Sequence, residues 1–332
     1  MPIKILPIVA LKIGMYVILD LAWYEHPFLK SHFLIATEDE IKKIAGLGLK
    51  GVKVDFSKSR VRVEEAVAPP PHENSEGMTD HKSKDPVVSE DLLTVLHDKK
   101  LEPERKAILV REHSFTMMQN LLDQPTAENL KEVKKGTSEI VDLILRDDDT
   151  TFFLVNITDH DYYTYTHSVN VGFLAVALAK ALFKNSDAHD LHALGAGFFL
   201  HDLGKVHIDL NIINKPGKLT DDEMQEMKRH PALGFFLLQE AKEMTKELKL
   251  IVLQHHEKLN GTGYPSGLRG DDIHIYGRIC AIADIFDALT SVRPYKNKMP
   301  SFTALKLMRD EMVPHHLQKD LLDKFILMFK AP

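Results

Sequence analysis

The chain has 332 residues, of which 44% are hydrophobic and 27% are charged, and its formal net charge at pH 7 is −6. This length allows two or three domains with full-sized cores, and the composition is that of an ordinary globular protein. The acidic balance excludes a general attraction to nucleic acid or to an anionic membrane, so a phosphate-bearing substrate has to be held by local cations.

The cysteine content indicates a reducing compartment, and the hydrophobic runs indicate neither a membrane span nor an export signal. The single cysteine, Cys280, excludes an internal disulfide and is expected to be buried packing rather than a nucleophile. The apolar N-terminal residues are interrupted by lysines and a proline. The most apolar helical stretch, residues 171–182, is shorter than the roughly 20 residues that a membrane span requires. We therefore expect a cytoplasmic protein with no membrane partner.

A small α/β domain is predicted over residues 1–66. Strand-like runs rich in branched residues occupy 3–9, 15–19, 33–35 and 52–56. Thr37, followed three residues later by Glu40, forms a capping box that opens a short helix between the third and fourth runs. This domain carries no catalytic signature.

A disordered, proline-rich linker is predicted over residues 67–87. Three consecutive prolines favour an extended chain there, and the polar residues that follow cannot form a core.

Helical periodicity begins near residue 88 and no strand pattern follows residue 150, so the chain is predicted to be mainly α. Residues 88–124 are predicted as connecting helices, and residues 125–332 as a helical catalytic domain. One connecting helix runs from Pro103 to just before Pro125. Its methionines indicate core packing or the seam of a homodimer.

The most informative stretch is an apolar helical run that ends in His201 and Asp202. Neighbouring residues on a helix point about 100° apart, so both side chains reach one pocket only at a helix end. Gly204 is expected to stop the helix, because glycine tolerates the left-handed turn that closes helices. An imidazole and a carboxylate suit divalent transition metals, and an aspartate can bridge two ions. Alone, such a pair is more often a histidine at a helix end beside a solvated aspartate.

Further imidazoles and carboxylates lie near predicted helix ends or inside apolar helices. They are His167, His230, His255, His256 and Asp284. Thr220 and Glu223 form a second capping box. The helix that they open is expected to end at His230, because Pro231 disfavours helix at the residue before it.

A bundle of five helices could bring these groups to two neighbouring ions. One ion would take His167, His201, Asp202 and Asp284, and the other would take Asp202, His230, His255 and His256. Two ions roughly 3.5–4 Å apart suit phosphodiester hydrolysis, in which a bridging hydroxide attacks while the ions neutralise charge on phosphorus. The mixed nitrogen and oxygen donors favour transition metals over magnesium and leave iron, manganese, zinc and nickel open.

The ordered motifs resemble those of the HD-GYP phosphodiesterases, a branch of the HD metal-dependent phosphohydrolases. They are His201-Asp202 with Gly204-Lys205, His255-His256-Glu257, Gly263-Tyr264-Pro265, Ala283-Asp284 and Arg293-Pro294-Tyr295-Lys296. The resemblance covers roughly residues 125–330. It implies an HD-superfamily helical bundle that hydrolyses cyclic di-GMP to linear pGpG, with onward cleavage to GMP left open. Residues 1–66 resemble a small, poorly characterised domain that often precedes HD-GYP modules.

Carried over position by position, the resemblance assigns roles to single residues. It implies that two divalent ions, iron or manganese in the first place, are held by His167, His201, Asp202, His230, His255, His256 and Asp284. Lys205 would contact the bridging water or the scissile phosphate and act with Asp202 in catalysis. Tyr264, Arg293 and Lys296 would hold substrate phosphates or shape the pocket. The GYP loop is also implied to contact GGDEF-domain diguanylate cyclases.

Two positions depart from the family pattern. Some members carry a glutamate four residues before the first histidine ligand, associated with a third metal, whereas this chain has Tyr163. We therefore expect two ions and a preference for the first cleavage. Asn260 replaces an aspartate common just before the Gly-x-Gly-Tyr-Pro run, and no metal duty attaches to it. Glu257 and Asp287 are interpreted equally well as partners of the ligands or as solvated helix charges.

Two alternatives to cyclic di-GMP hydrolysis stay open. One is hydrolysis of another cyclic dinucleotide, such as cyclic GMP-AMP. The other is a regulatory module that binds a cyclic dinucleotide or a GGDEF domain without turnover. Degenerate metal positions would favour the second alternative, but all seven positions are intact.

Overall fold

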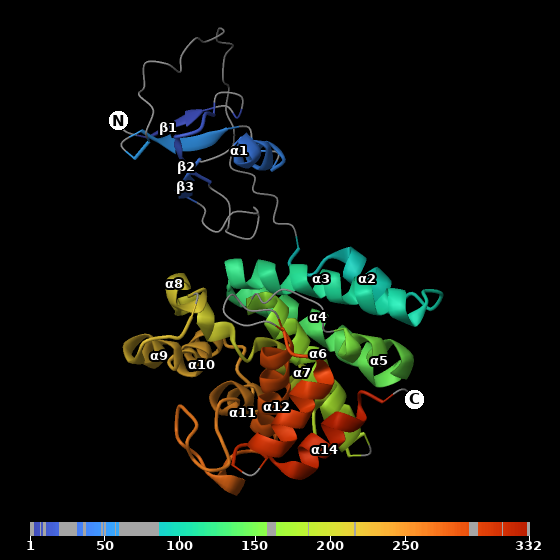
Figure 1. The fold of residues 1–332 in the computed structure, drawn as a ribbon. Coiled ribbons are helices and arrows are strands. Elements are labelled where there is room, and N and C mark those ends of the chain that lie inside the picture. The colour runs from blue at the N-terminus through green and yellow to red at the C-terminus, as the bar shows by residue number, and fades with distance from the viewer. Residues whose placement is uncertain are drawn as a thin grey trace. The chain divides into compact units, whose positions relative to one another are not determined.

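The computed structural model describes residues 3–6, 8, 11–19, 32–35, 38–47, 49, 51–56, 58–59, 86–157, 164–184, 186–215, 217–291, 298–313 and 315–330. The chain divides into two compact units, Met1–Lys82 and Ser83–Pro332, and each is described by itself (Figure 1).

The first unit is a four-stranded antiparallel sheet with one helix. Its elements are β1 (Ile3–Leu6), β2 (Tyr16–Ile18), β3 (His32–Leu34), α1 (Glu38–Ala45) and β4 (Val52–Asp55), and the strand order is β1-β4-β2-β3. In register, Ile3 lies opposite Asp55, Tyr16 opposite Leu34, and Val17 opposite Val54. The four predicted strands and the helix are confirmed. Three strands are shorter than predicted, because only the paired residues of each apolar run join the sheet, and β3 is shifted by one residue toward the N-terminus.

The first unit has a hydrophobic core of its own. Met15, Val17, Ile35, Ile44 and Val54 are fully buried in it. These residues alternate along the strands and recur on one face of α1, as the sequence pattern predicts. Thr37, the predicted helix cap, lies outside the described residues.

The second unit is a bundle of helices. Its α-helices are α2 (Glu90–His97), α3 (Pro103–Asp123), α4 (Ala127–Arg146), α5 (Asp148–Asn156), α6 (Thr164–Phe183), α7 (Leu191–Leu200), α8 (Leu210–Ile213), α9 (Asp221–Met227), α10 (His230–Glu240), α11 (Lys246–Gln254), α12 (Ile275–Thr290), α13 (Ser301–Leu307) and α14 (Lys319–Leu327). Shorter helices are η3 (Leu203–His207), η4 (Gly270–Asp272) and the π-helix η5 (Met308–Met312). The predicted mainly α class is confirmed.

The helical unit already includes the end of the predicted linker. Val87 is buried in the helical core, and its backbone N–H donates to the Glu132 carboxylate at 3.1 Å. Residues 67–85 of that linker lie outside the described residues. The domain limits at residues 66 and 125 therefore stay predictions.

Helix α6 runs through the centre of the bundle, between α3, α7 and α12 (Figure 1). By length and composition it could cross a membrane, and it is the one such helix among the described residues. However, 89% of its most apolar window is buried inside the unit. Its hydrophobicity is thus explained by its place in the core, which carries His167 into the interior.

Two local predictions around the histidines are wrong. The helix opened by Thr220 keeps its capping box but ends at Met227, and His230 begins the next helix with Pro231 in its first turn. Proline is favoured at that position because its missing N–H would have no helical partner there. Gly204 also does not take a left-handed conformation.

Gly204 is needed for close backbone approach instead. A Cβ on Gly204 would lie 2.0 Å from the His230 carbonyl oxygen and 2.4 Å from the Gly234 nitrogen. Any side chain would therefore separate η3 from α10. This contact fixes the turn after the His-Asp pair directly against the start of α10.

Candidate metal centre

Seven side chains that the sequence singles out converge at one place in the helical unit. They come from α6 (His167), the α7–η3 junction (His201 and Asp202), the start of α10 (His230), the end of α11 (His255 and His256) and α12 (Asp284). All except His256 are buried. Segments separated by more than a hundred residues thus contribute to one cluster, which we call the HD cluster.

Asp202 lies at the centre of the HD cluster, and its two oxygens face different histidines. Asp202 Oδ2 lies 3.4 Å from His167 Nε2 and 3.5 Å from His201 Nε2. Asp202 Oδ1 lies 3.2 Å from His230 Nε2 and 3.7 Å from His255 Nε2. One carboxylate therefore joins two groups of donors, which is the arrangement expected of a shared ligand.

Asp284 spans the same two groups from the opposite helix. Its Oδ1 lies 3.1 Å from His167 Nε2, and its Oδ2 lies 3.5 Å from His256 Nδ1. Atoms within 4.8 Å of one another form one set with His167, His201 and Asp202, and a second set with Asp202, His230, His255 and His256. These sets match the two groups predicted from the sequence, except for Asp284. The prediction placed Asp284 in the first group, whereas in the structure it faces both.

Backbone carbonyls orient three of the imidazoles. Nδ1 lies 2.8 Å from Phe198 O in His201, 2.8 Å from Met227 O in His230, and 3.0 Å from Val252 O in His255. A carbonyl can only accept, so Nδ1 carries the hydrogen and Nε2 keeps its lone pair. Three lone pairs therefore point into the HD cluster.

Polar atoms of the HD cluster lack the partners that buried groups normally have. His201 Nε2 and Asp202 Oδ1 are buried and make no hydrogen bond. Such orphaned acceptors cost free energy unless a cation or a donor satisfies them. A divalent transition metal fits this set, because it takes imidazole nitrogen and carboxylate oxygen together.

Protonation states in the HD cluster also fit a metal. Burial lowers the pKa of His201 to about 4 and that of His230 to about 3, and it holds the pKa of His256 well below its usual value. Burial alone would raise the pKa of Asp202, but Lys205 and the neighbouring imidazoles outweigh it and keep that pKa well below its usual value. Neutral imidazoles and ionised carboxylates are the forms that bind metals.

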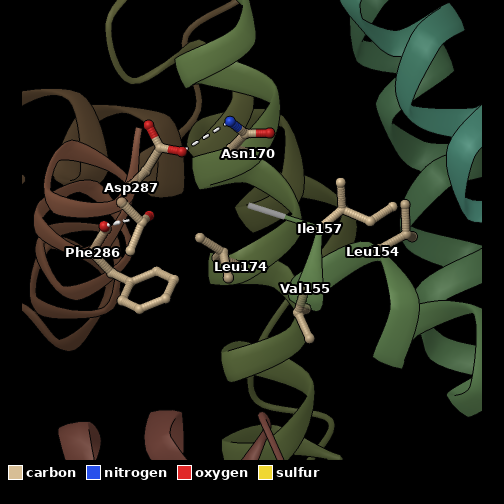
Figure 2. A pocket seen from close by; sticks show the side chains of 8 residues that line it. Leu154, Val155, Ile157, Asn170, Leu174, Phe286 and Asp287 are labelled. Atoms are coloured by element: carbon tan, nitrogen blue, oxygen red, sulfur yellow. Dashed lines mark hydrogen bonds between the residues drawn. The ribbon is translucent and has the colours of Figure 1, made fainter. Parts of the chain in front are cut away.

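Asp287 supports the HD cluster from behind. Its Oδ2 accepts from His167 Nδ1 at 2.7 Å and from Ser291 Oγ at 3.1 Å. Its Oδ1 accepts from Asn170 Nδ2 at 2.9 Å, a bond that Figure 2 shows. Asp287 is 1% exposed, so the solvated alternative is wrong, and its hydrogen bond to His167 agrees with the ligand-partner interpretation. The His167–Asn170 and Asp287–Ser291 spacings place each pair on one helix face, a signal that the sequence reading missed.

A small cavity lies beside Asp287, between α5, α6 and α12 (Figure 2). Its volume is about 10 Å³, and Leu154, Leu174 and Phe286 contribute apolar lining. This space holds at most one water molecule, so it is no substrate pocket.

Glu257 anchors the loop that follows the paired histidines. Its carboxylate accepts backbone N–H bonds from Ser266 at 2.7 Å, Leu268 at 3.0 Å and Gly267 at 3.1 Å. Glu257 is 4% exposed and contacts no residue of the HD cluster through these bonds. It is therefore neither of the two alternatives, but a clamp for the loop that carries Tyr264.

The proposed catalytic and substrate residues lie at different distances from the cluster. Lys205 Nζ donates to Asp202 Oδ2 at 2.5 Å. The Tyr264 ring lies 4.6 Å from the His256 ring and 6.3 Å from the His230 ring, measured between centroids. Arg293 and Lys296 lie outside the described residues.

Comparison with known proteins places both parts of the chain. Residues 156–320 match the family described as the HD domain, and residues 3–140 match a domain of unknown function, DUF3391. A cyclic di-GMP phosphodiesterase of Pseudomonas aeruginosa is 32% identical over 310 residues, which cover 93% of this chain and 72% of that protein. The 3′3′-cGAMP-specific phosphodiesterase 1 of Vibrio cholerae is 33% identical over 215 residues, covering 64% of this chain and 47% of that protein.

The fold agrees with these matches. A solved structure described as an HDG"Y"P protein from Bdellovibrio bacteriovorus superimposes with a TM-score of 0.64 at 19% identity, covering 99% of this chain and all of the other. The helical bundle and the HD cluster define an HD-domain metal-dependent phosphohydrolase. Within that class, the chain belongs to the HD-GYP family of phosphodiesterases and carries the DUF3391 domain at its N-terminus.

Proposed function

We propose that this phosphodiesterase hydrolyses cyclic di-GMP to linear pGpG. The observation that carries the proposal is the pair of Asp202 oxygens, each facing its own group of buried imidazoles. Relatives that act on cyclic dinucleotides support the choice of substrate. Water adds to phosphorus and the bond to the 3′ oxygen breaks, so the product has a 5′-phosphate and a 3′-hydroxyl.

The seven residues of the HD cluster would hold two divalent ions, iron or manganese. Such ions supply charge neutralisation at the phosphate and lower the pKa of water. His167, His201 and Asp202 would hold one ion, and His230, His255 and His256 would hold the other together with Asp202. Asp284, which faces both groups, completes them.

Lys205 would act on the substrate side of Asp202. Its ammonium lies 2.5 Å from the shared carboxylate and is mostly buried. A lysine in this place keeps Asp202 ionised and offers its remaining protons to a phosphate oxygen or to the attacking water. Lys205 would thereby supply positive charge at the reacting phosphate, which the net negative charge of the protein does not supply.

The direct test is turnover by reduced, metal-defined protein on cyclic di-GMP and on 3′3′-cGAMP, with product lengths resolved. We expect pGpG from cyclic di-GMP, slower onward cleavage to GMP, and no product from His201→Ala. Selective cleavage of 3′3′-cGAMP would instead establish cyclic GMP-AMP as the substrate, the alternative that the Vibrio cholerae relative supports. Tight binding of either nucleotide without product would instead establish a regulatory module.

Two further points belong to the proposal. The GYP loop, held by Glu257, would present a surface to GGDEF-domain diguanylate cyclases, and the protein would work in the cytoplasm. A pull-down of a GGDEF domain with the Glu257→Gln variant and the parent protein tests the first point. Unchanged capture by the variant would show that the clamped loop is not the contact.

A further inference from the structure

Lys228 lies at the edge of the HD cluster. It is the C-cap residue of α9, two residues before His230, and its Nζ lies 5.6 Å from the centroid of the Tyr264 ring. The same ring also packs against the rings of His256 and His230. The Lys228 ammonium is thus one aromatic ring away from two proposed metal ligands.

Lys228 differs from nearby basic residues in having no acidic partner. Lys205 is paired with Asp202, Lys215 with Glu223, and Arg229 with Glu226. Among the described residues, no carboxylate lies within ion-pair distance of Lys228, and its ammonium lies over the Tyr264 ring. The negative face of an aromatic ring stabilises an ammonium without neutralising it, so the charge stays available to an anion.

A cyclic dinucleotide needs such a charge. It carries two phosphodiesters, and only one of them can sit on the HD cluster during a cleavage event. The second phosphate needs cations outside the HD cluster, because a protein of net charge −6 offers it no general attraction. The resemblance offers Arg293 and Lys296 for substrate phosphates, and Lys228 is a further cation at the edge of the cluster. With one phosphate on the HD cluster, the other would contact a cation at the edge of the cluster.

We propose that Lys228, laid over Tyr264, binds the phosphate that is not being cleaved. The inference rests on the proposed function and adds a substrate-binding residue to it. It implies that Lys228 distinguishes substrates with two phosphodiesters from substrates with one. Loss of the charge should therefore raise KM for a cyclic dinucleotide more than for a simple diester.

The test compares Lys228→Met, Lys228→Arg and the parent protein, all loaded with the same metal. The substrates are cyclic di-GMP and bis(p-nitrophenyl) phosphate, which has one phosphodiester. Lys249→Met is the matched control, because Lys249 Nζ lies 5.9 Å from the Phe235 ring and outside the HD cluster.

We expect Lys228→Met to raise KM for cyclic di-GMP about tenfold with kcat nearly kept, as loss of one charge-assisted contact would do. The rise should be much smaller for the simple diester, should shrink at high salt, and should be reversed by Lys228→Arg. Lys249→Met should match the parent protein.

Equal rises in KM for both substrates, or a Lys228→Met variant that behaves like Lys249→Met, would overturn the inference while the proposed function stands. A parent protein that cleaves the simple diester but no cyclic dinucleotide would refute the proposed function, and the inference with it.

Discussion

The inner and outer sides of the HD cluster are built differently. On the inner side His167 is 1% exposed, and a buried carboxylate, Asp287, fixes its ring. On the outer side the His256 side chain is 23% exposed and packs against Tyr264 from a loop. The difference teaches that the inner side of the cluster is fixed by buried hydrogen bonds, whereas the outer side is covered by an aromatic ring from a loop.

The largest expected effect comes from removing the residue common to both sides. Asp202→Ala should lower kcat by at least about 10³-fold, because both groups of donors lose their shared oxygen ligand. Bound metal per chain, measured by elemental analysis, should fall from two to below one.

Arg293→Ala provides the contrast to that variant. It should keep two ions and mainly raise KM, because the resemblance places this residue on the substrate. Equal losses of metal in the two variants would contradict this division between ion binding and substrate binding.

The next largest effect should come from the inner side. Asp287→Ala should weaken metal binding about 10–100-fold, as expected when the carboxylate that orients a ligating histidine is removed. Metal titration should show that one ion is lost before the other, since Asp287 bonds to His167, which belongs to one of the two groups of donors. Asp310→Ala, at an exposed aspartate, serves as the control, and an Asp287→Ala variant with parental affinity at both sites would refute the comparison.

A smaller effect is expected on the outer side. Glu257→Gln replaces one acceptor oxygen with an N–H₂ donor that faces backbone N–H groups. We expect roughly a tenfold fall in kcat/KM through misplacement of Tyr264, while two ions remain bound. The control is Glu226→Gln, in the last turn of α9. Loss of metal in Glu257→Gln would show that Glu257 supports metal binding rather than the position of Tyr264.

The last effect concerns stability rather than catalysis, and it is measured on the metal-free protein as a function of pH. Between pH 6.5 and about 4 the unfolded chain binds protons at His201 and His230 that the folded chain does not, because burial lowers both pKa values. Stability should therefore rise with pH in this window and be lost as the pH falls, on the order of 1 kcal/mol per pH unit for each histidine. Urea unfolding at pH 7 and pH 5 measures this.

A matched pair of variants sharpens the pH measurement. His201→Asn should reduce the pH dependence of the free energy of unfolding, because one of the two buried imidazoles that stay neutral in the folded chain is removed. His192→Asn should not, since His192 is exposed and pairs with Asp142. Equal free energies of unfolding of the parent protein at pH 7 and pH 5 would contradict the expectation.

The sequence predicts much of this because metal-binding chemistry restricts the residue types. Seven scattered histidines and aspartates were predicted to meet, and they do. Helix limits were harder to predict: a proline such as Pro231 can directly follow a helix end or lie in the first turn of a new helix, and only tertiary packing decides between them. Asp287, Glu257 and Lys228 could not be assigned, because their roles depend on which helix or loop lies opposite, and spacing does not encode that.

Gly204 has a consequence for the whole reaction centre. Because bare backbone meets bare backbone between η3 and α10, the segments that carry Asp202 and His230 are in direct main-chain contact. The main chain thus limits how far the turn that carries Asp202 lies from the start of α10. A substitution at position 204 would therefore move Asp202 away from His230 although neither of these residues is changed.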